Sequence, residues 1–204
     1  MLNLSIVTAQ KQLDILLGEL DKTISEKSVY SEIRERRIDS LQTLINQEAD
    51  LKKRYDIYQL LFKEYRHYNM NSALSVAEKK LLIAEELNDK QLVYFAKMNT
   101  AEILGIMGMY KESLDITNNI VRKKLDKEYW PYYFHLYHSL YSLMSANSLT
   151  QYEKNNYDKL ISQYKDSILQ IIDLNSLGYQ LVKNGKLLEQ GRYEKALHLM
   201  NQCY

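Results

Sequence analysis

The sequence predicts an all-α fold, and three observations lead to this prediction. The 204 residues include only six glycines and one proline, too few turn formers for a sandwich or barrel of many strands. Apolar residues recur at three- and four-residue steps along almost the whole chain from Gln10 onward, as on one face of an amphipathic helix. No alternating apolar and polar run flanked by turn dipeptides indicates a hairpin. We therefore expect more than about 75% helix and no sheet.

Two amphipathic segments are expected before the repeats, within residues 10–54. Their apolar stripes are Leu13, Leu16, Leu17, Leu20 and Ile24, followed by Ile38, Leu41, Leu44 and Ile45. The basic clusters Arg34–Arg37 and Lys52–Arg54 are diluted by nearby acidic residues and indicate solvated faces.

The segment at residues 1–9 allows two interpretations. Val7–Ala9 resembles the small-residue end of a secretory signal, but no positively charged segment precedes it and the apolar run before it is short. Residues 1–9 are therefore either the remnant of a signal peptide whose start is missing or an ordinary N-terminal end. The first interpretation predicts export to the periplasm, and the second leaves a cytoplasmic location open.

An internal repeat organises the rest of the chain. A glycine is followed by a tyrosine two residues later, then a small residue and a leucine, in Gly108–Leu114 and again in Gly191–Leu197. The matching positions are Gly108, Tyr110 and Ser113 in one copy and Gly191, Tyr193 and Ala196 in the other. A degenerate third copy occupies Tyr68–Leu74. Because amphipathic segments flank each motif, each one indicates a turn between two helices.

These motifs resemble the tetratricopeptide (TPR) repeat, whose G-x-Y-x-x-A signature lies between two antiparallel helices. The resemblance implies a right-handed α-α superhelix of helix pairs over residues 55–204, continuous with residues 10–54 as one domain. In such a repeat the glycine adopts the left-handed backbone that ends the first helix, the tyrosine packs over the turn, and the small residue lets the helices approach. We expect the pairs at about 55–88, 89–125, 126–174 and 175–204. The third pair lacks the motif and is placed by spacing and periodicity.

The order of segments in the N-terminal half resembles a more specific family. Leu20–Ile24, Arg36–Leu41, Tyr55–Tyr65 and Asn71–Leu74 follow one another as in the sensor part of exported TPR-containing transcriptional regulators of Gram-negative gut anaerobes. In that family a signal peptide precedes the repeat domain, and a membrane helix, a coiled coil and a cytoplasmic helix-turn-helix follow it. The resemblance therefore implies a sensor module. The membrane and DNA-binding parts are not among these residues, which stop at Tyr204 within a repeat helix.

The charge balance and the missing motifs argue against several function classes. Lys and Arg number 27 and Asp and Glu 26, so the net charge of +1 attracts neither nucleic acid nor an anionic membrane. The longest uncharged stretch, residues 129–152, carries too many polar side chains to cross a bilayer. No P-loop, G-x-G-x-x-G, G-x-S-x-G or H-E-x-x-H motif occurs. We expect no catalysis, no cofactor, no nucleic-acid partner and no membrane span in this chain.

Two residue types that often carry chemistry are better explained by packing. His135 and His138 are three residues apart on one expected helix, but their neighbours supply no carboxylate, so a packed or groove-edge pair is preferred to a metal site. Cys203 has no neighbouring base and orienting partner that would make it a nucleophile. An activity abolished by changing either histidine would be needed to favour an enzyme.

The function that we expect is the binding of a peptide or protein in an aromatic groove. A soluble cytoplasmic scaffold with a constitutive protein partner is the alternative. The resemblance places the first helix of each pair on the concave side, with specific residues pointing into the groove. They are Tyr55, Tyr58, Phe62, Tyr65 and Arg66 in the first pair, Phe95, Met98, Glu102 and Ile106 in the second, and Tyr133 and Tyr137 in the divergent pair.

Tyrosine suits such a groove because it combines an apolar ring with a polar tip, although tyrosines at helix seams are often structural. We expect the aromatic residues at 55, 58, 62 and 65 to stay partly exposed, and Leu60, Leu61 and Ala73 to be buried.

The last expected helix also predicts a partner. Its apolar face, formed by Ala196, Leu197, Leu199 and Met200, has no following helix to cover it, and repeat arrays need a polar cap to stay soluble. We expect the chain either to self-associate through residues 193–204 or to be a fragment of a longer protein.

Overall fold

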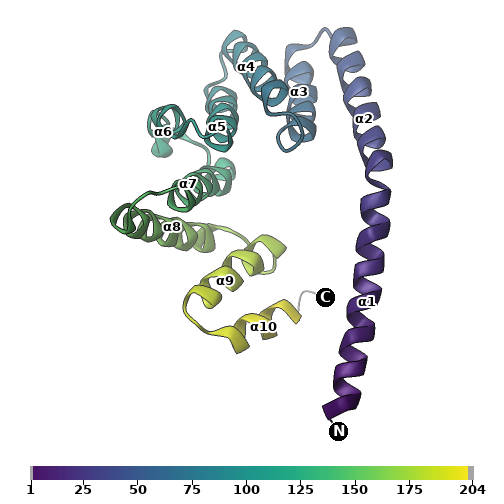
Figure 1. Ribbon diagram of the computed structural model, residues 1–204. Helices are drawn as coiled ribbons and strands as arrows, with labels where there is room; N and C mark the ends of the chain where they lie inside the picture. The colour runs from purple at the N-terminus through teal and green to yellow at the C-terminus, as the bar shows by residue number, and fades with distance from the viewer. Residues whose placement is uncertain (1, 202–204) are drawn as a thin grey trace. The chain divides into compact units, whose positions relative to one another are not determined.

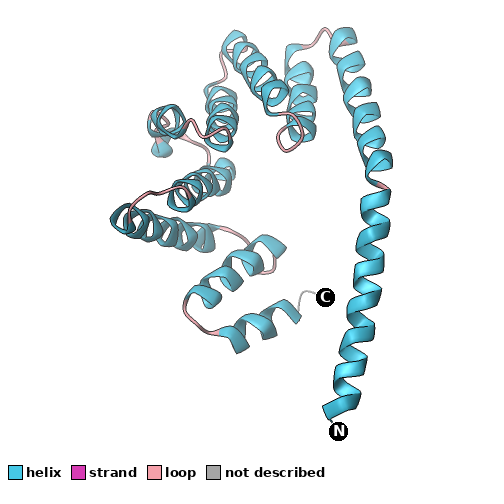
Figure 2. Cartoon of the chain, viewed as in Figure 1, coloured by secondary structure: helices cyan, strands magenta, loops and turns pink. Residues whose placement is uncertain are grey.

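The protein is helical throughout the part that the computed structural model describes, which is the backbone of residues 2–201 and the side chains of residues 10–201. In this part 84% of the chain is helical and no strand is present, which confirms the all-α prediction (Figure 2). The described residues form ten α-helices that pack in adjacent pairs, as in a TPR-like helical repeat fold. The side chains of Val7–Ala9, in the proposed signal remnant, and the residue Cys203 lie outside the described residues.

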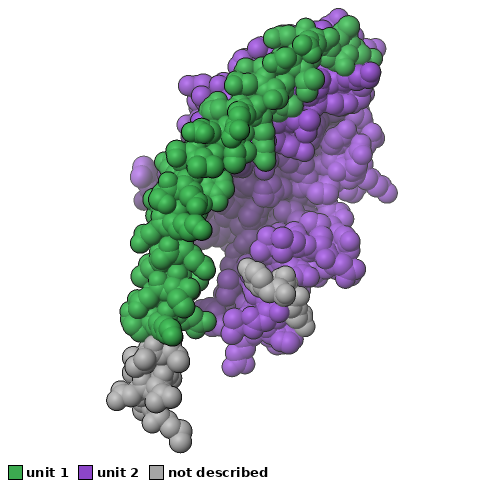
Figure 3. All heavy atoms as spheres, turned by 90° about the vertical axis from the view of Figure 1, so that its right-hand side faces the viewer, with its two compact units in different colours: residues 1–50 green, residues 51–204 purple. Residues whose placement is uncertain are grey.

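The chain divides into two compact units, residues 1–50 and residues 51–204 (Figure 3). Unit 1 consists of α1 (Leu2–Ser25) and α2 (Lys27–Gln47), which are separated by a break at Glu26. The predicted apolar stripe of α1, from Leu13 to Ile24, is exposed. No described helix is long and apolar enough to cross a membrane.

Unit 2 contains four pairs of helices, stacked in chain order (Figure 1). The pairs are α3 (Leu51–Tyr65) with α4 (Met70–Glu86), α5 (Lys90–Ile106) with α6 (Tyr110–Asn118), α7 (Trp130–Ala146) with α8 (Gln151–Ile171), and α9 (Leu177–Glu189) with α10 (Tyr193–Asn201). Two 3-10 turns, Arg122–Lys124 and Lys127–Tyr129, join α6 to α7. Neighbouring pairs touch because α4 packs on α5, α5 on α7, and α8 on α9.

The two predicted glycine turns have the left-handed backbone that the motif requires. The φ angle is +84° at Gly108 and +69° at Gly191, in the region where residues with a Cβ atom are strained. Asn88 ends α4 in the same way, with a φ angle of +52°. The degenerate turn after α3 works differently, because Asn69 caps α4 by accepting a hydrogen bond from the amide of Ser72 at 3.0 Å.

Small residues let α5 approach two other helices closely. Ser113 is fully buried, and its hydroxyl donates to the carbonyl oxygen of Ala101 at 2.6 Å. A Cβ atom at Gly105 would lie only 2.9 Å from a methyl group of Leu140 and 3.4 Å from the Ser113 hydroxyl. Replacing either residue with a larger one would therefore push α5 away from α6 or α7.

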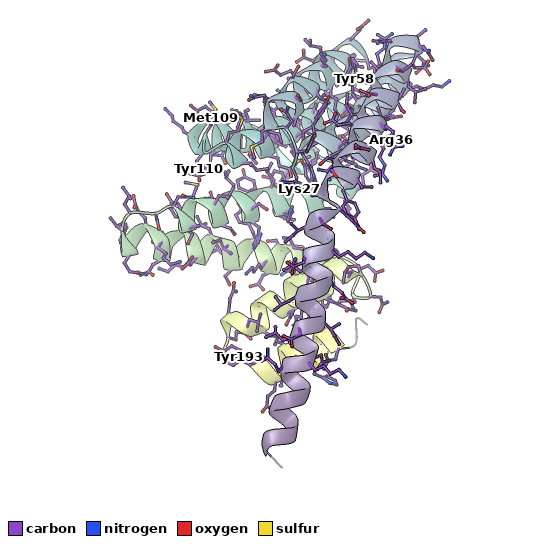
Figure 4. All side chains as sticks on the ribbon, turned by 45° about the vertical axis from the view of Figure 1, so that its right-hand side comes forward. Lys27, Arg36, Tyr58, Met109, Tyr110 and Tyr193 are labelled. Carbon is purple, nitrogen blue, oxygen red and sulfur yellow. The ribbon has the colours of Figure 1, made fainter. Side chains whose placement is uncertain are left out.

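The two turn tyrosines have different surroundings. Tyr110 is half-buried, and its hydroxyl accepts a hydrogen bond from Asn147 Nδ2 at 3.0 Å, at the end of α7. Tyr193 stands at the start of α10 and is 67% exposed (Figure 4). The expectation that this tyrosine packs over its turn is therefore wrong, because no described helix after α10 offers it a contact. Ala196, the small residue of the same motif, is buried as the motif implies, so the expectation that it belongs to an uncovered apolar face of this helix is wrong.

The third pair, which lacks the glycine motif, is fixed by other local signals. Pro131 lies in the first turn of α7, where its missing N–H group costs no helical hydrogen bond. Thr150 and Glu153 form a reciprocal capping box at the start of α8. Between the two helices, the rings of Tyr137 and Tyr164 stack with centroids 4.8 Å apart and an interplanar angle of 4°. These contacts replace the absent turn motif.

Candidate functional site

A cavity of about 370 Å³ lies where α5 and α7 meet the residues that follow α3. Its floor and walls are mainly apolar and include Ala101, Gly105, Leu136, Leu140 and Leu143. Polar side chains reach it from three places, with Arg66 and His67 after α3, Glu102 on α5, and His135, His138, Ser139 and Ser142 on α7. An apolar cavity with a few convergent polar groups is the usual form of a ligand site.

An ion pair closes one side of this cavity. Arg66 Nη1 lies 3.5 Å from Glu102 Oε1, and the arginine side chain is 37% exposed while that of the glutamate is 14% exposed. The second carboxylate oxygen of Glu102 accepts a hydrogen bond from the Tyr132 hydroxyl at 2.5 Å. This short distance is typical of a hydroxyl that donates to a charged carboxylate. Burial, followed by the charge of Glu102, raises the pKa of Tyr132 well above its usual value, so this hydroxyl remains a donor.

Behind the ion pair, a chain of hydrogen bonds runs into the protein and ends at a buried lysine. Asn99 Nδ2 donates to the Tyr132 hydroxyl at 2.9 Å, and Asn99 Oδ1 accepts from Lys80. Lys80 also donates to Gln59 Oε1. The side chains in this chain come from α3, α4, α5 and α7, so one polar network joins the first three helix pairs.

Lys80 has no exposed surface and sits among aromatic rings. Its Nζ atom is 4.8 Å from the ring centroid of Phe95, 4.9 Å from that of Tyr55 and 5.5 Å from that of Phe62, distances at which a cation is attracted to a ring. Burial, with a smaller contribution from Lys63, nevertheless lowers the pKa of Lys80 to about 7. The lysine is therefore close to losing its charge at neutral pH.

The two histidines of α7 lie side by side at the cavity, with their rings stacked and centroids 6.2 Å apart. Neither ring nitrogen of His138 has a hydrogen-bond partner among the described residues, although both nitrogens are buried. Burial, followed by the charge of Lys165, lowers the pKa of His138 to about 4. His138 is thus neutral at physiological pH. Within the described residues no group of three or more His, Cys, Asp and Glu side chains is arranged to hold a metal ion.

Several predicted groove aromatics are buried in helix seams instead of facing a groove. Tyr55 is 2% exposed and Phe62 is 1% exposed, so the expectation that they stay accessible is wrong. The Tyr55 hydroxyl donates to the carbonyl oxygen of Leu92, which explains why a buried seam position accepts tyrosine. Leu60, which we expected to be buried, is 49% exposed, whereas Leu61 and Ala73 are buried as expected.

The same correction applies to three more residues of the predicted groove, Met98, Tyr133 and Tyr137, all of which are buried in one hydrophobic core cluster. The Tyr137 hydroxyl donates to Asn118 Oδ1 at 2.8 Å, so its polar tip is satisfied inside the protein. The remaining members, Tyr58, Tyr65 and Phe95, are half-buried and outside the cavity lining. Arg66, Glu102 and Ile106 do line the cavity.

The polar network behind the cavity brings together residues that no sequence pattern connects. Lys80 occupies a position on the buried stripe of α4 that otherwise consists of Ala73, Val76, Ala77, Ile83 and Ala84. Helical periodicity could have identified this lysine, because it lies on the same face of α4 as the buried apolar residues. Tyr132 and Asn99 carry no such signal, because only the packing of α5 on α7 brings them together.

The comparison with protein families agrees with this architecture. Residues 24–204 match the family described as the SusR N-terminal TPR domain. The chain belongs to this family. The match covers unit 2 completely and extends into unit 1, so the family's repeat domain includes α2 as well as the four pairs. A search of curated proteins found no match.

Membership in the SusR N-terminal TPR family makes the chain a helical repeat module of the kind that mediates protein–protein interaction. Such domains are generally non-enzymatic scaffolds. The cavity between α3, α5 and α7 is therefore a candidate binding site.

Proposed function

We propose that the chain binds a peptide or a protein segment in the cavity between α3, α5 and α7, as the sensor half of a larger regulator. The observation that carries this proposal is the cavity itself, a largely apolar space of about 370 Å³ with an accessible ion pair at one side. Of the predicted groove residues, Arg66, Glu102 and Ile106 contribute to it. A constitutive protein partner in the same place is the alternative, and it makes the chain a cytoplasmic scaffold.

The polar network suggests how occupancy would be signalled. Glu102 contacts both Arg66, which follows α3, and Tyr132 on α7, and Asn99 continues the network to Lys80 on α4. A ligand that draws Arg66 away from Glu102 therefore acts on contacts that join three helix pairs. Because packed interfaces change between discrete arrangements, such a ligand shifts how the pairs stack.

A peptide selection tests the binding site. Random peptides displayed on phage are selected on the immobilised chain, and the Kd of a synthetic copy is measured by fluorescence anisotropy. The variant Ser139→Trp fills the cavity from α7, and Lys111→Trp places the same side chain on the exposed surface of α6 as a control. We expect Ser139→Trp to weaken binding by at least about tenfold and Lys111→Trp to leave it unchanged. Equal affinities for both variants would place the site elsewhere.

The gene distinguishes the sensor from the scaffold. An export signal upstream of Met1, together with a membrane helix and a DNA-binding domain downstream of Tyr204, would support a periplasmic sensor. A reading frame without an export signal and without those domains would support the scaffold. The DNA that flanks the coding sequence is therefore the decisive observation.

The exposed surface of α10 supports a second interaction, self-association of the chain. Leu197 is 64% exposed, while its neighbour Ala196 is buried where α10 packs on α9. Sedimentation equilibrium tests this proposal with Leu197→Glu, and with Lys195→Glu as a control on the same helix. We expect association that Leu197→Glu abolishes and Lys195→Glu retains. A wild-type chain that remains monomeric at high concentration contradicts the proposal.

A further inference from the structure

We propose that the cavity between α3, α5 and α7 is an anchor site for an acidic peptide segment. It takes one leucine-sized apolar side chain and pairs the carboxylate next to that side chain with Arg66. The inference rests on the proposed peptide-binding function and names the chemistry that the peptide must carry.

The apolar part of the cavity has room for a side chain of this size. Its volume of about 370 Å³ lies at the lower end of the range of roughly 300–1,000 Å³ found for ligand sites. The walls there are Leu136, Leu140 and Leu143, with Ala101 and Gly105 as the floor. A helix of a partner protein cannot enter such a space, whereas one side chain that projects from a peptide can.

Arg66 provides donors that the protein itself leaves unused. A guanidinium group carries five N–H donors, and among the described residues Arg66 makes one ion pair, with Glu102. Both oxygens of Glu102 are engaged, Oε1 by Arg66 and Oε2 by the Tyr132 hydroxyl. The remaining N–H donors of the partly exposed guanidinium group are therefore available to an acceptor on a ligand. A carboxylate satisfies it with charge-assisted bonds, and an ammonium group does not.

His138 adds a second polar feature to the wall. Its two ring nitrogens are buried without hydrogen-bond partners among the described residues, and a buried polar group without a partner is destabilising. A peptide amide beside the apolar side chain supplies both a donor and an acceptor, and a small rotation of the ring brings a nitrogen to it. Lys165 lies close to His138, but it is paired with Glu189. His138 is therefore an uncharged residue of the cavity lining that can form a hydrogen bond with a backbone amide of the peptide.

N-acetyl-L-leucine is a suitable probe because it combines the apolar side chain, one amide and one carboxylate. Binding is followed by chemical-shift titration of the ¹⁵N-labelled full chain. N-acetyl-L-leucinamide lacks the carboxylate, and N-acetylglycine lacks the side chain. For the wild type we expect the acid to bind on the order of tenfold more tightly than the amide, the ratio expected for one charged hydrogen bond. We expect N-acetylglycine to bind at least about tenfold more weakly than N-acetyl-L-leucine.

The variant Arg66→Gln tests the assigned residue. It should bind the acid and the amide equally, with the amide as tightly bound as in the wild type, and this unchanged amide affinity also shows that the cavity remains folded. Arg192→Gln removes the same charge at the α9–α10 turn, outside the cavity lining, and should keep the preference for the acid. Arg66→Lys keeps the charge and should keep part of the preference.

Three results would overturn the inference. They are equal affinity of the wild type for acid and amide, a preference for the acid that survives Arg66→Gln, and shifts that map away from the residues that line the cavity. If no probe binds while selected peptides still bind in a manner sensitive to Ser139→Trp, the anchor chemistry is wrong and the proposed function stands. If neither binds, both are wrong.

Discussion

Lys80 makes the stability of this protein depend on pH in a window where few other groups titrate. The folded pKa of about 7 lies below the value of 10.5 for an exposed lysine. Between these two values the unfolded chain holds a proton that the folded chain has released. The unfolded state therefore binds more protons, and the free energy of unfolding rises with pH.

The slope that one proton gives is about 1.4 kcal/mol per pH unit. From pH 7.5 to pH 9.5 the contribution of Lys80 thus reaches at most about 3 kcal/mol. The charges of Asp56 and Glu102 and the aromatic rings around Nζ favour the protonated form, so the observed change will lie below this limit. Measurements stop at pH 9.5 because Tyr55 and Tyr132, whose pKa values are raised, oppose the trend at higher pH.

The test compares Lys80→Met with Lys79→Met, which removes the same charge from an exposed position of α4. Urea unfolding at pH 7.5, 8.5 and 9.5 gives the free energy of unfolding of each variant and of the wild type. At pH 7.5 we expect Lys80→Met to be at least as stable as the wild type, because a methionine removes a buried charge. Its advantage should then shrink with rising pH, whereas Lys79→Met should run parallel to the wild type. Parallel profiles for all three proteins would show that Lys80 keeps its proton, and the reasoning would be refuted.

Three further predictions follow from burial, backbone angle and charge. Phe62→Ala should lower the free energy of unfolding by about 3–5 kcal/mol, and Tyr58→Ala by only about 1 kcal/mol, because the first ring is buried and the second is half-buried; similar losses in chemical denaturation would contradict this distinction. Gly108→Ala should cost about 1–2 kcal/mol because of its φ angle of +84°, while Gly185→Ala in the interior of α9 should gain up to about 1 kcal/mol; thermal unfolding measures both, and a shift of the same sign in both variants counts against the explanation. The folded pKa of His138, about 4, lies below the unfolded value of 6.5, so the free energy of unfolding should fall as pH falls from 6.5 to 4, and His138→Leu should lose this dependence. The charged and titratable groups near the ring are Lys165, His135 and Glu189. If His138→Leu shows the same loss of stability at acid pH as the wild type, His138 does not cause that loss.

Local signals of the sequence were sufficient to predict the fold. The left-handed backbone at Gly108 and Gly191 is a local property, and a glycine at this place in the motif predicts it directly. Ser113 likewise follows from the motif, since the approach of two consecutive helices depends on a small residue at that place. The start of α8 could also have been predicted from the sequence, because Thr150 and Glu153 have the spacing of a capping box.

The groove was harder to predict because one helical face can meet either solvent or another helix. Tyr55, Tyr58, Phe62 and Tyr65 share a face by periodicity, yet Tyr55 and Phe62 are buried while the other two are half-buried. This difference in burial depends on the angle at which α3 packs against α4 and α5. The periodicity of the α3 sequence does not predict that angle. A tyrosine is compatible with both places because its hydroxyl can bond to water or, as Tyr55 does, to a buried carbonyl oxygen.

The cavity arises where small residues and a polar network meet, and this explains why it lies between α5 and α7. Gly105 brings α5 against Leu140, which closes the floor, while Tyr132 and Glu102 hold the two helices together at the side. The half-buried carboxylate of Glu102 is paired with both Arg66, which follows α3, and the Tyr132 hydroxyl. The ion pair with Glu102 therefore holds the partly exposed Arg66 cation beside an apolar cavity. An acidic, apolar peptide would recognise this combination.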